Sequence, residues 1–536
     1  MAVKRKYPVG IQGFEGLRKD GYIYVDKTPL IYKMITQGKP YFLSRPRRFG
    51  KSLLVTTLAA IFEGKRELFE AFTTKDGIEQ PQLFIATTDW DWEPHPVFRF
   101  DFSTGDLVTI DQLDTLIDET LNVYEQRYGI SPNVKDANIR MTNLLRTSHE
   151  QTGRRAVVLV DEYDNFILHA LGDAEKVATA RQRFQNLFGP LKSEDEHLRF
   201  VFITGISKFS QMGVFSKLNN LANISMVPAY DAICGISETE LTTQLQPDIV
   251  LMAENNNTTY DDMLNRLKRR YDGYHFSEAM TDMYNPFSLF NTFSNLKLSD
   301  YWFDRGTSGA LIKMLAMMPP INMAENEGVT LPDTAFDLPF ESFEDPMPIL
   351  YQSGYLTIKG FQQIGEMSMY TLGFPNLEVR KGFADCLYRH VANSLAATKS
   401  RNTLLLAYNA FYLSNNLVPF IEAIRTFFAS VPYQWEKDNR NEHYYHALLY
   451  TLLSAFGADV RAEEPSALGC CDLTLKMPKE IYVMEIKYDH SADEALEQIE
   501  RKGYAEKYLL DGRPIAKVGI AFNSKERNIT EWKILS

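Results

Sequence analysis

The stretch YFLSRPRRFGKS at residues 41–52 decides the fold of the first part of this 536-residue chain. Its opening residues are apolar and predict a strand, and residues 52–63 repeat apolar side chains at helical spacing. A Gly-Lys-Ser ending between a strand and a helix is typical of a phosphate-binding loop. In such a loop Gly50 lets backbone N–H groups approach phosphate oxygens, Lys51 reaches the β and γ phosphates, and Ser52 ligates Mg²⁺.

The loop departs from the usual motif, because Arg45 stands where a first glycine is expected. A basic turn between a strand and a helix is therefore the simpler alternative. Charge favours phosphate binding, since residues 1–60 hold twelve basic and three acidic side chains. The whole chain has 57 Lys and Arg against 69 Asp and Glu, a net charge of −12, which excludes a chain-wide basic surface for polyanions.

A second motif lies at residues 157–162, where the apolar run VVLVDE ends in two acids. After a phosphate-binding loop, Asp161 would hold Mg²⁺ through water and Glu162 would polarise the attacking water. The alternative is a buried strand followed by an acidic turn. A third apolar run, FVFITG at residues 200–205, brings Thr204 to a strand end, where it could sense the γ phosphate or orient the water. The order of the three elements favours a nucleotide site.

Short apolar runs alternate with amphipathic helical stretches through the first part of the chain. Such alternation predicts an α/β fold with a parallel sheet between helices. Three domains are therefore expected: a P-loop parallel-sheet core over residues 1–235, a mainly helical lid or linker region over residues 236–430, and a small α/β domain of the restriction-endonuclease type over residues 431–536.

The C-terminal part carries a second group of polar side chains on a predicted hairpin. Its strands are expected over residues 470–477 and 481–488. Since side chains alternate along a strand, Asp472, Glu485 and Lys487 converge if the strands pair through these faces. Two carboxylates can hold one or two divalent ions that activate water against a phosphodiester, and the ammonium can assist. A cross-strand ion pair on a half-exposed sheet is the alternative.

Several phrases together resemble one protein family. Residues 24–28 (YVDKT), 44–52 (SRPRRFGKS) and 161–164 (DEYD) are similar to the AAA-ATPase-like family, which is found joined to a nuclease-like C-terminal domain in many bacterial and some archaeal proteins. The resemblance extends over nearly the whole chain through phrases at residues 204–209, 271–276, 284–287 and 354–357.

This resemblance implies an ATP-binding and ATP-hydrolysing core with Mg²⁺ as cofactor, and it makes Arg45 a normal part of the loop. The guanidinium groups of the loop could bind the γ phosphate, a neighbouring acid or a nucleic acid backbone, with a solvated basic turn as the alternative. The expected metal ligands here are Ser52 and Asp161, and the expected catalytic residue is Glu162. The expected nucleotide-binding residues are Arg47, Arg48, Gly50, Lys51, Ser52, Asp161 and Thr204.

An acid, a gap and then Glu-x-Lys on paired strands resembles the PD-(D/E)XK nuclease core. The resemblance implies that Glu442, on a preceding helix, joins the metal site of Asp472 and Glu485. It also implies that Gln498 braces Lys487. The expected catalytic residues are thus Asp472, Glu485, Lys487 and Gln498, with Mg²⁺ as the metal and Mn²⁺ as an alternative.

The chain has four cysteines and no run of 18 apolar residues, so a reducing cytoplasm is the expected location and membrane spanning is not expected. Members of the nuclease family often carry Gly-Arg before the hairpin acid, whereas this chain carries Cys470 and Cys471. That difference either weakens the binding of substrate phosphate or has no effect. A zinc site needs four suitably spaced ligands, so both cysteines are expected to be small buried residues.

Two further features have a functional and a structural interpretation. His443 and His446 lie three residues apart on a predicted helix and could ligate a metal, but a packing role is expected. Residues 271–276 (YDGYHF) are aromatic enough for base stacking, although such a cluster more often fills an interface.

Three functions are compatible with these observations. The first is an enzyme in which ATP gates Mg²⁺-dependent phosphodiester hydrolysis, with DNA rather than RNA as the expected substrate. The second is a nucleotide-switched scaffold that binds nucleic acid or protein through an inactive nuclease fold, and the third is an ATPase switch alone. Residues 441–536 hold twelve basic and sixteen acidic side chains, which predicts weak nonspecific DNA affinity. ATPases of this kind often assemble, so a homo-oligomer is a further possibility.

Overall fold

A computed structural model describes residues 5–38, 40–103, 107–131, 134–170, 172–207, 220–302, 328–337, 347–391, 395–429 and 442–535, with the side chains of residues 387–391, 395–402 and 442–445 left out. The chain divides into two compact units. The first comprises residues 1–302 and 330–376, and the second comprises residues 303–329 and 377–536.

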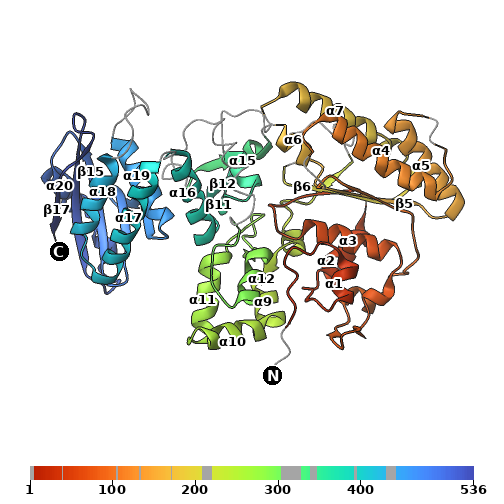
Figure 1. The fold of residues 1–536 in the computed structure, drawn as a ribbon, viewed down its shortest axis with the longest axis horizontal. Helices are drawn as coiled ribbons and strands as arrows, with labels where there is room; N and C mark the ends of the chain where they lie inside the picture. The colour runs from red at the N-terminus through yellow and green to blue at the C-terminus, as the bar shows by residue number, and fades with distance from the viewer. Residues whose placement is uncertain are drawn as a thin grey trace. The chain divides into compact units, whose positions relative to one another are not determined.

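The first unit is built on a parallel five-stranded sheet in the order β4-β5-β6-β1-β7. Figure 1 shows helices on both of its faces, with α4, α5 and α7 on one side and α1, α2 and α3 on the other. The strands are β1 (Tyr41–Ser44), β4 (Val97–Asp101), β5 (Ala156–Asp161), β6 (Leu198–Gly205) and β7 (Ala222–Asn223). The helices are α1 (Phe14–Lys19), α2 (Thr28–Gln37), α3 (Lys51–Phe62), α4 (Ile110–Arg127), α5 (Ala137–Thr152) and α7 (Ala174–Phe188). This arrangement confirms the predicted α/β class.

Local sequence explains several of these elements. β5 is apolar at five consecutive positions and every one of its residues is buried, as expected for an inner strand of a parallel sheet. α4 begins at a capping box in which Thr109 accepts from the Gln112 N–H and the Gln112 side chain returns to the backbone of Thr109. α5 ends at Gly153, whose φ of 67° is the left-handed conformation that favours glycine.

Helices dominate the continuation of the first unit. Ser237 and Glu240 form a capping box that starts α9, and Asn285 caps α12 through the Ser288 N–H. The elements are β8 (Ile236–Ser237), α9 (Glu238–Gln244), α10 (Gln246–Asn255), α11 (Tyr260–Tyr271), β9 (Met283–Tyr284) and α12 (Pro286–Asn295). Smaller elements earlier in the unit are β2 (Phe72–Thr73), β3 (Glu79–Gln80), α6 (Asn165–His169) and α8 (Pro190–Ser193).

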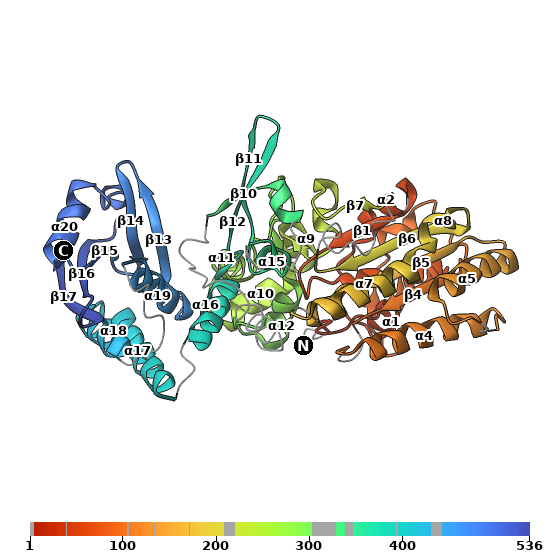
Figure 2. The same ribbon diagram turned by 90° about the horizontal axis from the view of Figure 1, so that it is seen from above.

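The first unit also contains a three-stranded antiparallel sheet, in a part of the chain for which the sequence predicts mainly helices. Its order is β10-β12-β11, and Figure 2 shows β11 and β12 as a long hairpin. The elements are β10 (Thr330–Pro332), α15 (Met347–Gln352), β11 (Thr357–Ile364) and β12 (Met367–Gly373). The hairpin turns at Gly365, whose φ is 62°, between Ile364 and Met367. The turn glycine was the available signal for this hairpin.

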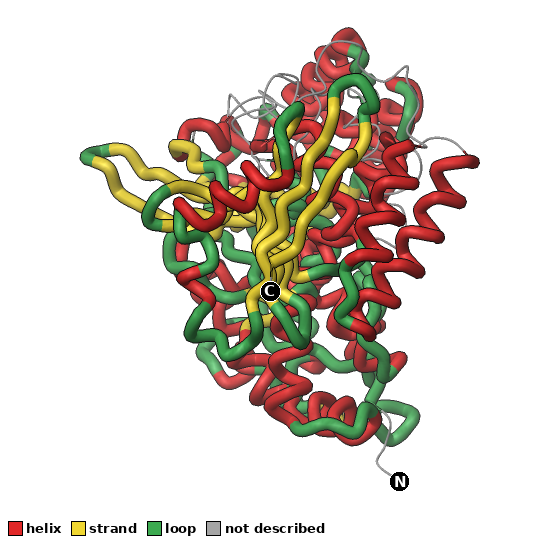
Figure 3. The backbone as a smooth tube through the Cα atoms, turned by 90° about the vertical axis from the view of Figure 1, so that its left-hand side faces the viewer, coloured by secondary structure: helices red, strands yellow, loops and turns green. Residues whose placement is uncertain are grey.

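The second unit is a mixed five-stranded sheet in the order β13-β14-β15-β16-β17. β15 and β16 are parallel and the other pairs are antiparallel, and Figure 3 shows the chain ending on a strand, β17. α20 contacts β15, β16 and β17, whereas α19 contacts β13, β14 and β15. The elements are α16 (Leu377–Val391), α17 (Leu395–Ser414), α18 (Val418–Ala429), α19 (Glu442–Ala455), β13 (Asp459–Ser466), β14 (Gly469–Lys476), β15 (Ile481–Tyr488), α20 (Ala492–Arg501), β16 (Ile515–Asn523) and β17 (Asn528–Leu535).

The division between the units lies at residues 376/377, whereas the sequence predicts the last domain boundary at 430/431. The reason is aromatic packing. The ring of Phe411 lies 5.2 Å from that of Tyr482, and the ring of Phe428 lies 5.2 Å from that of Phe522, so α17 and α18 cover the C-terminal sheet. Among the described residues, no helix has both the length and the apolar character needed to cross a membrane.

Candidate functional site

The phosphate-binding loop joins β1 to α3. Gly50 precedes the first residue of α3 and has a φ of 93°, a left-handed conformation that favours glycine. It is exposed, so its surroundings leave room for a ligand at the helix N-terminus. Lys51 is 4% exposed, and its Nζ donates to the carbonyl oxygens of Arg45 at 3.0 Å and Pro46 at 3.1 Å. The ammonium therefore closes the loop on itself.

The loop lies beside the carboxyl ends of the neighbouring strands. Ser52 forms a side-chain hydrogen bond with Asp161 at the end of β5, so the structure brings the two predicted metal ligands together. Burial raises the pKa of Asp161 to about 6, against the lowering effect of the Ser52 hydrogen bond. The Oδ1 atom of Asp161 is buried and has no hydrogen-bond partner among the described residues. An orphaned carboxylate oxygen beside a serine fits a Mg²⁺ site.

The other predicted residues of this site lie close by in the chain but differ in what they contact. Glu162 follows Asp161 directly, is half-buried and has a φ of 48°. Thr204 is fully buried, and its hydroxyl donates to the carbonyl oxygen of Leu43 at 2.8 Å. The hydroxyl proton of Thr204 thus ties β6 to β1, and a contact with nucleotide would have to use the oxygen lone pairs or exchange this bond.

Two acids near this site were not predicted. Asp101 ends β4 and pairs in register with Asp161, and its charge raises the Asp161 pKa further. Asp164 is fully buried, and its Oδ2 accepts from the N–H groups of Ile206 at 2.9 Å and Ser207 at 2.6 Å. Asp101 could have been predicted, because it ends a strand that runs parallel to the strand ending at Asp161. Asp164 could not, because its contact is with Ile206, 42 residues away in the chain.

The three arginines of the loop have different surroundings. Arg45 is 2% exposed, its Nη1 lies 2.6 Å from the carbonyl oxygen of Ser225, and its guanidinium lies 4.0 Å from the ring of Phe276. The Arg45 guanidinium is therefore structural. Arg47 is half-buried and forms no hydrogen bond or ion pair with the part of the chain that the structure describes, so it can reach a phosphate without losing such a contact.

Arg48 is held by the end of the helical region. Its Nη1 donates to the carbonyl oxygens of Tyr301 at 3.1 Å and Trp302 at 2.9 Å, and its guanidinium lies 4.0 Å from the ring of Phe287. Its φ of 69° is left-handed. To contact a phosphate, as predicted, this guanidinium would have to give up both carbonyl oxygens, so Arg48 is a weaker candidate than Arg47.

An apolar cavity of about 70 Å³ adjoins Gly50. Its wall includes Val25, Phe49, Leu54, Cys234 and Ile236. Apolar walls with a neighbouring phosphate-binding loop suit an aromatic base. The residues come from the YVDKT phrase, the loop, α3 and the chain around β8.

The aromatic residues of the 271–276 motif are buried, so their rings are not exposed for stacking on nucleic acid bases. Tyr271 is fully buried, and its hydroxyl donates to the carbonyl oxygen of Ser299 at 2.8 Å. Tyr274 packs edge to face against Phe49 of the phosphate-binding loop, with ring centres 4.8 Å apart. Phe276 lies under Arg45. The motif therefore fills an interface within the first unit, and base stacking by these rings is not supported.

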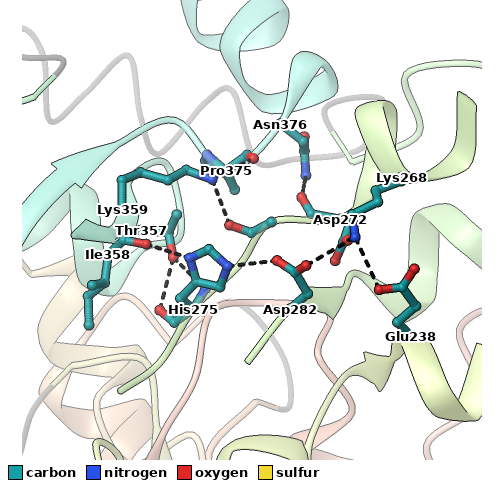
Figure 4. Close-up of polar contacts among 11 residues, drawn as sticks. Glu238, Lys268, Asp272, His275, Asp282, Thr357, Ile358, Lys359, Pro375 and Asn376 are labelled. Carbon is teal, nitrogen blue, oxygen red and sulfur yellow. Dashed lines mark hydrogen bonds and ion pairs between the residues drawn. The ribbon is translucent and has the colours of Figure 1, made fainter. Parts of the chain in front are cut away.

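Polar members of this motif hold several elements together, as Figure 4 shows. The His275 ring places Nδ1 2.7 Å from the carbonyl oxygen of Ile358 and Nε2 2.8 Å from Asp282 Oδ1. Lys268 lies 3.2 Å from Asp282 and 3.1 Å from Glu238. α9, α11 and β11 are thereby joined through one charged network.

The same cluster holds the last residues of the first unit (Figure 4). Asn376 Nδ2 donates to the carbonyl oxygen of Asp272 at 2.9 Å, and Lys359 Nζ donates to those of Gly273 at 2.9 Å and Pro375 at 3.0 Å. Burial raises the pKa of Asp272 to about 7. The chain leaving the first unit is thus fastened to a motif whose aromatic rings pack on the phosphate-binding loop.

The second predicted site lies on the hairpin of β14 and β15. Thr474 pairs with Val483 and Leu473 with Met484, so the predicted strand pairing is confirmed. The Oδ2 atom of Asp472 accepts from the N–H of Ile486 at 2.7 Å. This bond places the Asp472 carboxylate against β15, beside Glu485.

Glu485 is the most buried of the predicted nuclease residues, at 1% exposed. Its Oε1 accepts from Lys487 Nζ at 3.0 Å and from Gln498 Nε2, whereas its Oε2 is buried and has no hydrogen-bond partner among the described residues. Burial and then the negative charge of Asp472 raise the pKa of Glu485 to about 7, and Lys487 opposes that rise. Gln498 was expected to brace Lys487, but it contacts the acid instead.

α19 supplies the remaining residues of this region. It begins at Glu442, whose side chain lies outside the described residues, so the third expected metal ligand has no described position. Within the described side chains, no group of three His, Cys, Asp or Glu could hold a metal. Asp472 and Glu485 are the two described donors, and the orphaned Oε2 of Glu485 beside a second carboxylate fits a divalent ion. His446, one turn after Glu442, contacts the backbone of Asp472.

Comparison with known proteins matches the two parts of the chain that carry these residues to two families. The model of a predicted AAA-ATPase family matches residues 8–215, and the model of the PD-(D/E)XK nuclease superfamily matches residues 440–532. A protein of Azotobacter chroococcum mcd 1, described as "Uncharacterized protein in vnfD 5'region", is 35% identical over 549 residues that cover 99% of each chain. The chain belongs to the AAA-ATPase-like family with a C-terminal PD-(D/E)XK domain.

The PD-(D/E)XK domain carries Cys470 and Cys471 before Asp472, where its family often has Gly-Arg. Cys470 is exposed, whereas the thiol of the buried Cys471 lies 3.4 Å from the carbonyl oxygens of Leu473 and Met484. Burial raises the pKa of Cys471 to about 12. Cys471 packs with Val483 in the core under α20, where strict alternation predicted Cys470. The expectation of two buried cysteines is therefore met for Cys471 only.

Proposed function

We propose that this AAA-ATPase-like protein binds and hydrolyses ATP with Mg²⁺ and that its PD-(D/E)XK domain is a Mg²⁺-dependent phosphodiesterase acting on DNA. The observation that carries the proposal is Glu485, a buried carboxylate with one orphaned oxygen that lies next to a second carboxylate and an ammonium. A buried acid of raised pKa without a full set of donors is costly in a merely structural role.

In the ATPase unit, Lys51 and the backbone around Gly50 would bind the phosphates, and Arg47 would add a free guanidinium. Ser52 and Asp161 would hold the Mg²⁺. Glu162 would orient the attacking water. Arg48 would act only after exchanging its present contacts, and Thr204 would use its oxygen lone pairs or exchange its bond to Leu43. The apolar pocket beside Gly50 would take the base.

In the nuclease domain, Asp472 and Glu485 would hold the Mg²⁺ or Mn²⁺, with Glu442 as a third ligand. A bound divalent ion supplies a lowered water pKa and stabilises the charge on the phosphodiester. Lys487 would place its positive charge beside the attacked phosphate, and Gln498 would fix the direction of Glu485 by donating to Oε1. We further propose that the substrate is DNA rather than RNA, that the protein is cytoplasmic and that it assembles into a homo-oligomer.

The deciding experiment is cleavage of supercoiled and linear DNA by the full chain with Mg²⁺ or Mn²⁺, with and without ATP. Asp472→Asn should abolish cleavage, and Lys51→Ala should remove any effect of ATP. Asp493→Asn, which changes a 61% exposed acid on α20, is the matched control and should cut like the wild type. Cleavage that survives in Asp472→Asn would refute the assigned site, and an absence of cleavage with every metal would favour the scaffold function.

A further inference from the structure

His446 lies against the metal-binding strand of the nuclease domain. It is 3% exposed and projects from α19 so that its Nε2 lies 2.7 Å from the carbonyl oxygen of Asp472. A carbonyl oxygen only accepts, so Nε2 carries the hydrogen in this contact. The other ring nitrogen, Nδ1, lies 3.6 Å from Glu463 Oε1.

The contact falls where the pairing of β13 with β14 is interrupted at one position. Ala462 pairs with Leu473 and Glu464 with Cys471, and between them Glu463 has a left-handed φ of 47°. A non-glycine residue in that conformation costs free energy and disturbs the regular ladder. Glu463 lies opposite Asp472 in this register, so the backbone that carries the Asp472 carboxylate is held by local contacts as well as by the ladder.

Two donors from different elements hold Asp472. The N–H of Ile486 on β15 binds its carboxylate at 2.7 Å, and Nε2 of His446 on α19 binds its carbonyl oxygen at 2.7 Å. Since the carbonyl and the side chain share the same Cα, fixing the peptide plane fixes the direction in which the carboxylate leaves the strand. Metal sites respond to such support, because loss of an outer hydrogen bond typically lowers metal affinity by about 10- to 100-fold.

We infer that His446 is a positioning residue of the nuclease site, holding the backbone of Asp472 so that its carboxylate and that of Glu485 meet at one ion. The inference rests on the proposed nuclease function. The competing explanation is packing, in which His446 only fills space between α19 and β14. The two differ in what they require: positioning needs a donor at the place of Nε2, whereas packing needs only volume.

The test uses the full chain and Mn²⁺ alone, measured by calorimetry and by the electron paramagnetic resonance signal of free Mn²⁺. The component of binding that disappears in Asp472→Asn reports the nuclease site. His446→Leu keeps volume without a donor and should lower the affinity of that component by about tenfold or more. His446→Gln can place its amide nitrogen near the position of Nε2 and should stay within about threefold of the wild type.

Equal affinity of the Leu and Gln variants would overturn the inference about His446. If His446→Leu does not fold, as judged by circular dichroism, His446→Asn takes its place, because the shorter asparagine side chain cannot bring its amide to the carbonyl oxygen of Asp472. An Asn variant that binds Mn²⁺ as tightly as the Gln variant would likewise overturn the inference. A wild-type chain without an Asp472-dependent Mn²⁺ site would instead overturn the proposed function itself. Mn²⁺ binding without DNA cleavage would refute the phosphodiesterase activity, and the affinities of the Leu and Gln variants would then decide the role of His446 at the metal site alone.

Discussion

The ammonium of Lys51 lies 3.0 Å from the carbonyl oxygen of Arg45, inside its own loop. In the proposed complex with ATP, phosphate oxygens replace the carbonyl oxygens of Arg45 and Pro46, because phosphate attracts the positive charge more strongly. Lys51→Ala should therefore weaken ATP binding by at least about tenfold, since a hydrogen bond to a charged group contributes about 1.5–3 kcal/mol. Titration with a fluorescent ATP analogue measures the change. Lys75→Ala, at a side chain 78% exposed, is the control; equal affinity in the two variants would contradict the loop assignment.

The raised pKa of Asp161 predicts a pH dependence of metal-assisted nucleotide binding. The pKa is about 6, so the carboxyl group is protonated below that pH and the proton competes with Mg²⁺. Mg²⁺ should strengthen ATP binding above about pH 6, and this benefit should fade as the pH falls through 6. Calorimetry with and without Mg²⁺ between pH 5 and 8 checks this. In Asp161→Asn the Mg²⁺ benefit should be absent throughout, and a benefit that persists at low pH in the wild type would count against Asp161 as a ligand.

Alanine substitutions of Arg45 and Arg47 should affect different properties, stability in the first case and ATP binding in the second. Arg45→Ala leaves the buried carbonyl oxygen of Ser225 without its donor and removes the contact with Phe276, so it should destabilise the first unit by about 3 kcal/mol. Arg45→Lys should not restore stability, because lysine lacks the planar fork of donors. Arg47→Ala should leave stability unchanged and weaken ATP binding about three- to tenfold. Urea unfolding and ATP titration of the same proteins separate the two effects, and a stable Arg45→Ala variant would contradict the structural role.

Features set by neighbouring residues could be predicted from the sequence. The strand before Arg45, the helix from Lys51 and the pairing of Thr474 with Val483 depend on local periodicity or on one short turn, and all are present. The proximity of Ser52 and Asp161 could also be predicted, because parallel strands place their carboxyl ends at one edge of the sheet.

Features that depend on distant residues could not be predicted. The Arg45 guanidinium reaches the carbonyl oxygen of Ser225, 180 residues away and just after β7, so its burial depends on how that later part of the chain folds back onto the loop. Alternation along β14 predicted Cys470 on the face of Asp472 and Thr474, whereas Cys471 packs with Val483, so β14 departs from strict alternation beside Asp472, where no pair with Glu463 of β13 is formed. The hairpin around Gly365 was assigned to a helical region although its turn glycine was visible.

The raised pKa of Glu485 makes this residue a source of instability when no metal is bound. Its folded-state pKa of about 7 exceeds the ordinary value, so the folded protein keeps the proton longer than the unfolded chain, and stability falls as the pH rises from about 4.5 to 7. Glu485→Gln removes the buried charge while keeping an oxygen for Lys487. At pH 8 without metal the variant should be more stable than the wild type by on the order of 1 kcal/mol or more.

Mg²⁺ should reverse this order. It should bind the folded wild type at Glu485 and raise its thermal midpoint, whereas the variant has lost that ligand, so its midpoint should rise less, by what the Ser52 and Asp161 site alone contributes. Scanning calorimetry at pH 8 and pH 5, with EDTA and with Mg²⁺, measures the thermal midpoints under these four conditions. At pH 5 the difference in stability between the metal-free wild type and variant should become smaller, because Glu485 is then protonated. Glu480→Gln on the same hairpin is a control for acid removal away from the site, although it also changes a contact with Tyr482. A metal-free Glu485→Gln variant that is less stable than the wild type at pH 8 would mean that Glu485 serves as a structural ion-pair partner of Lys487.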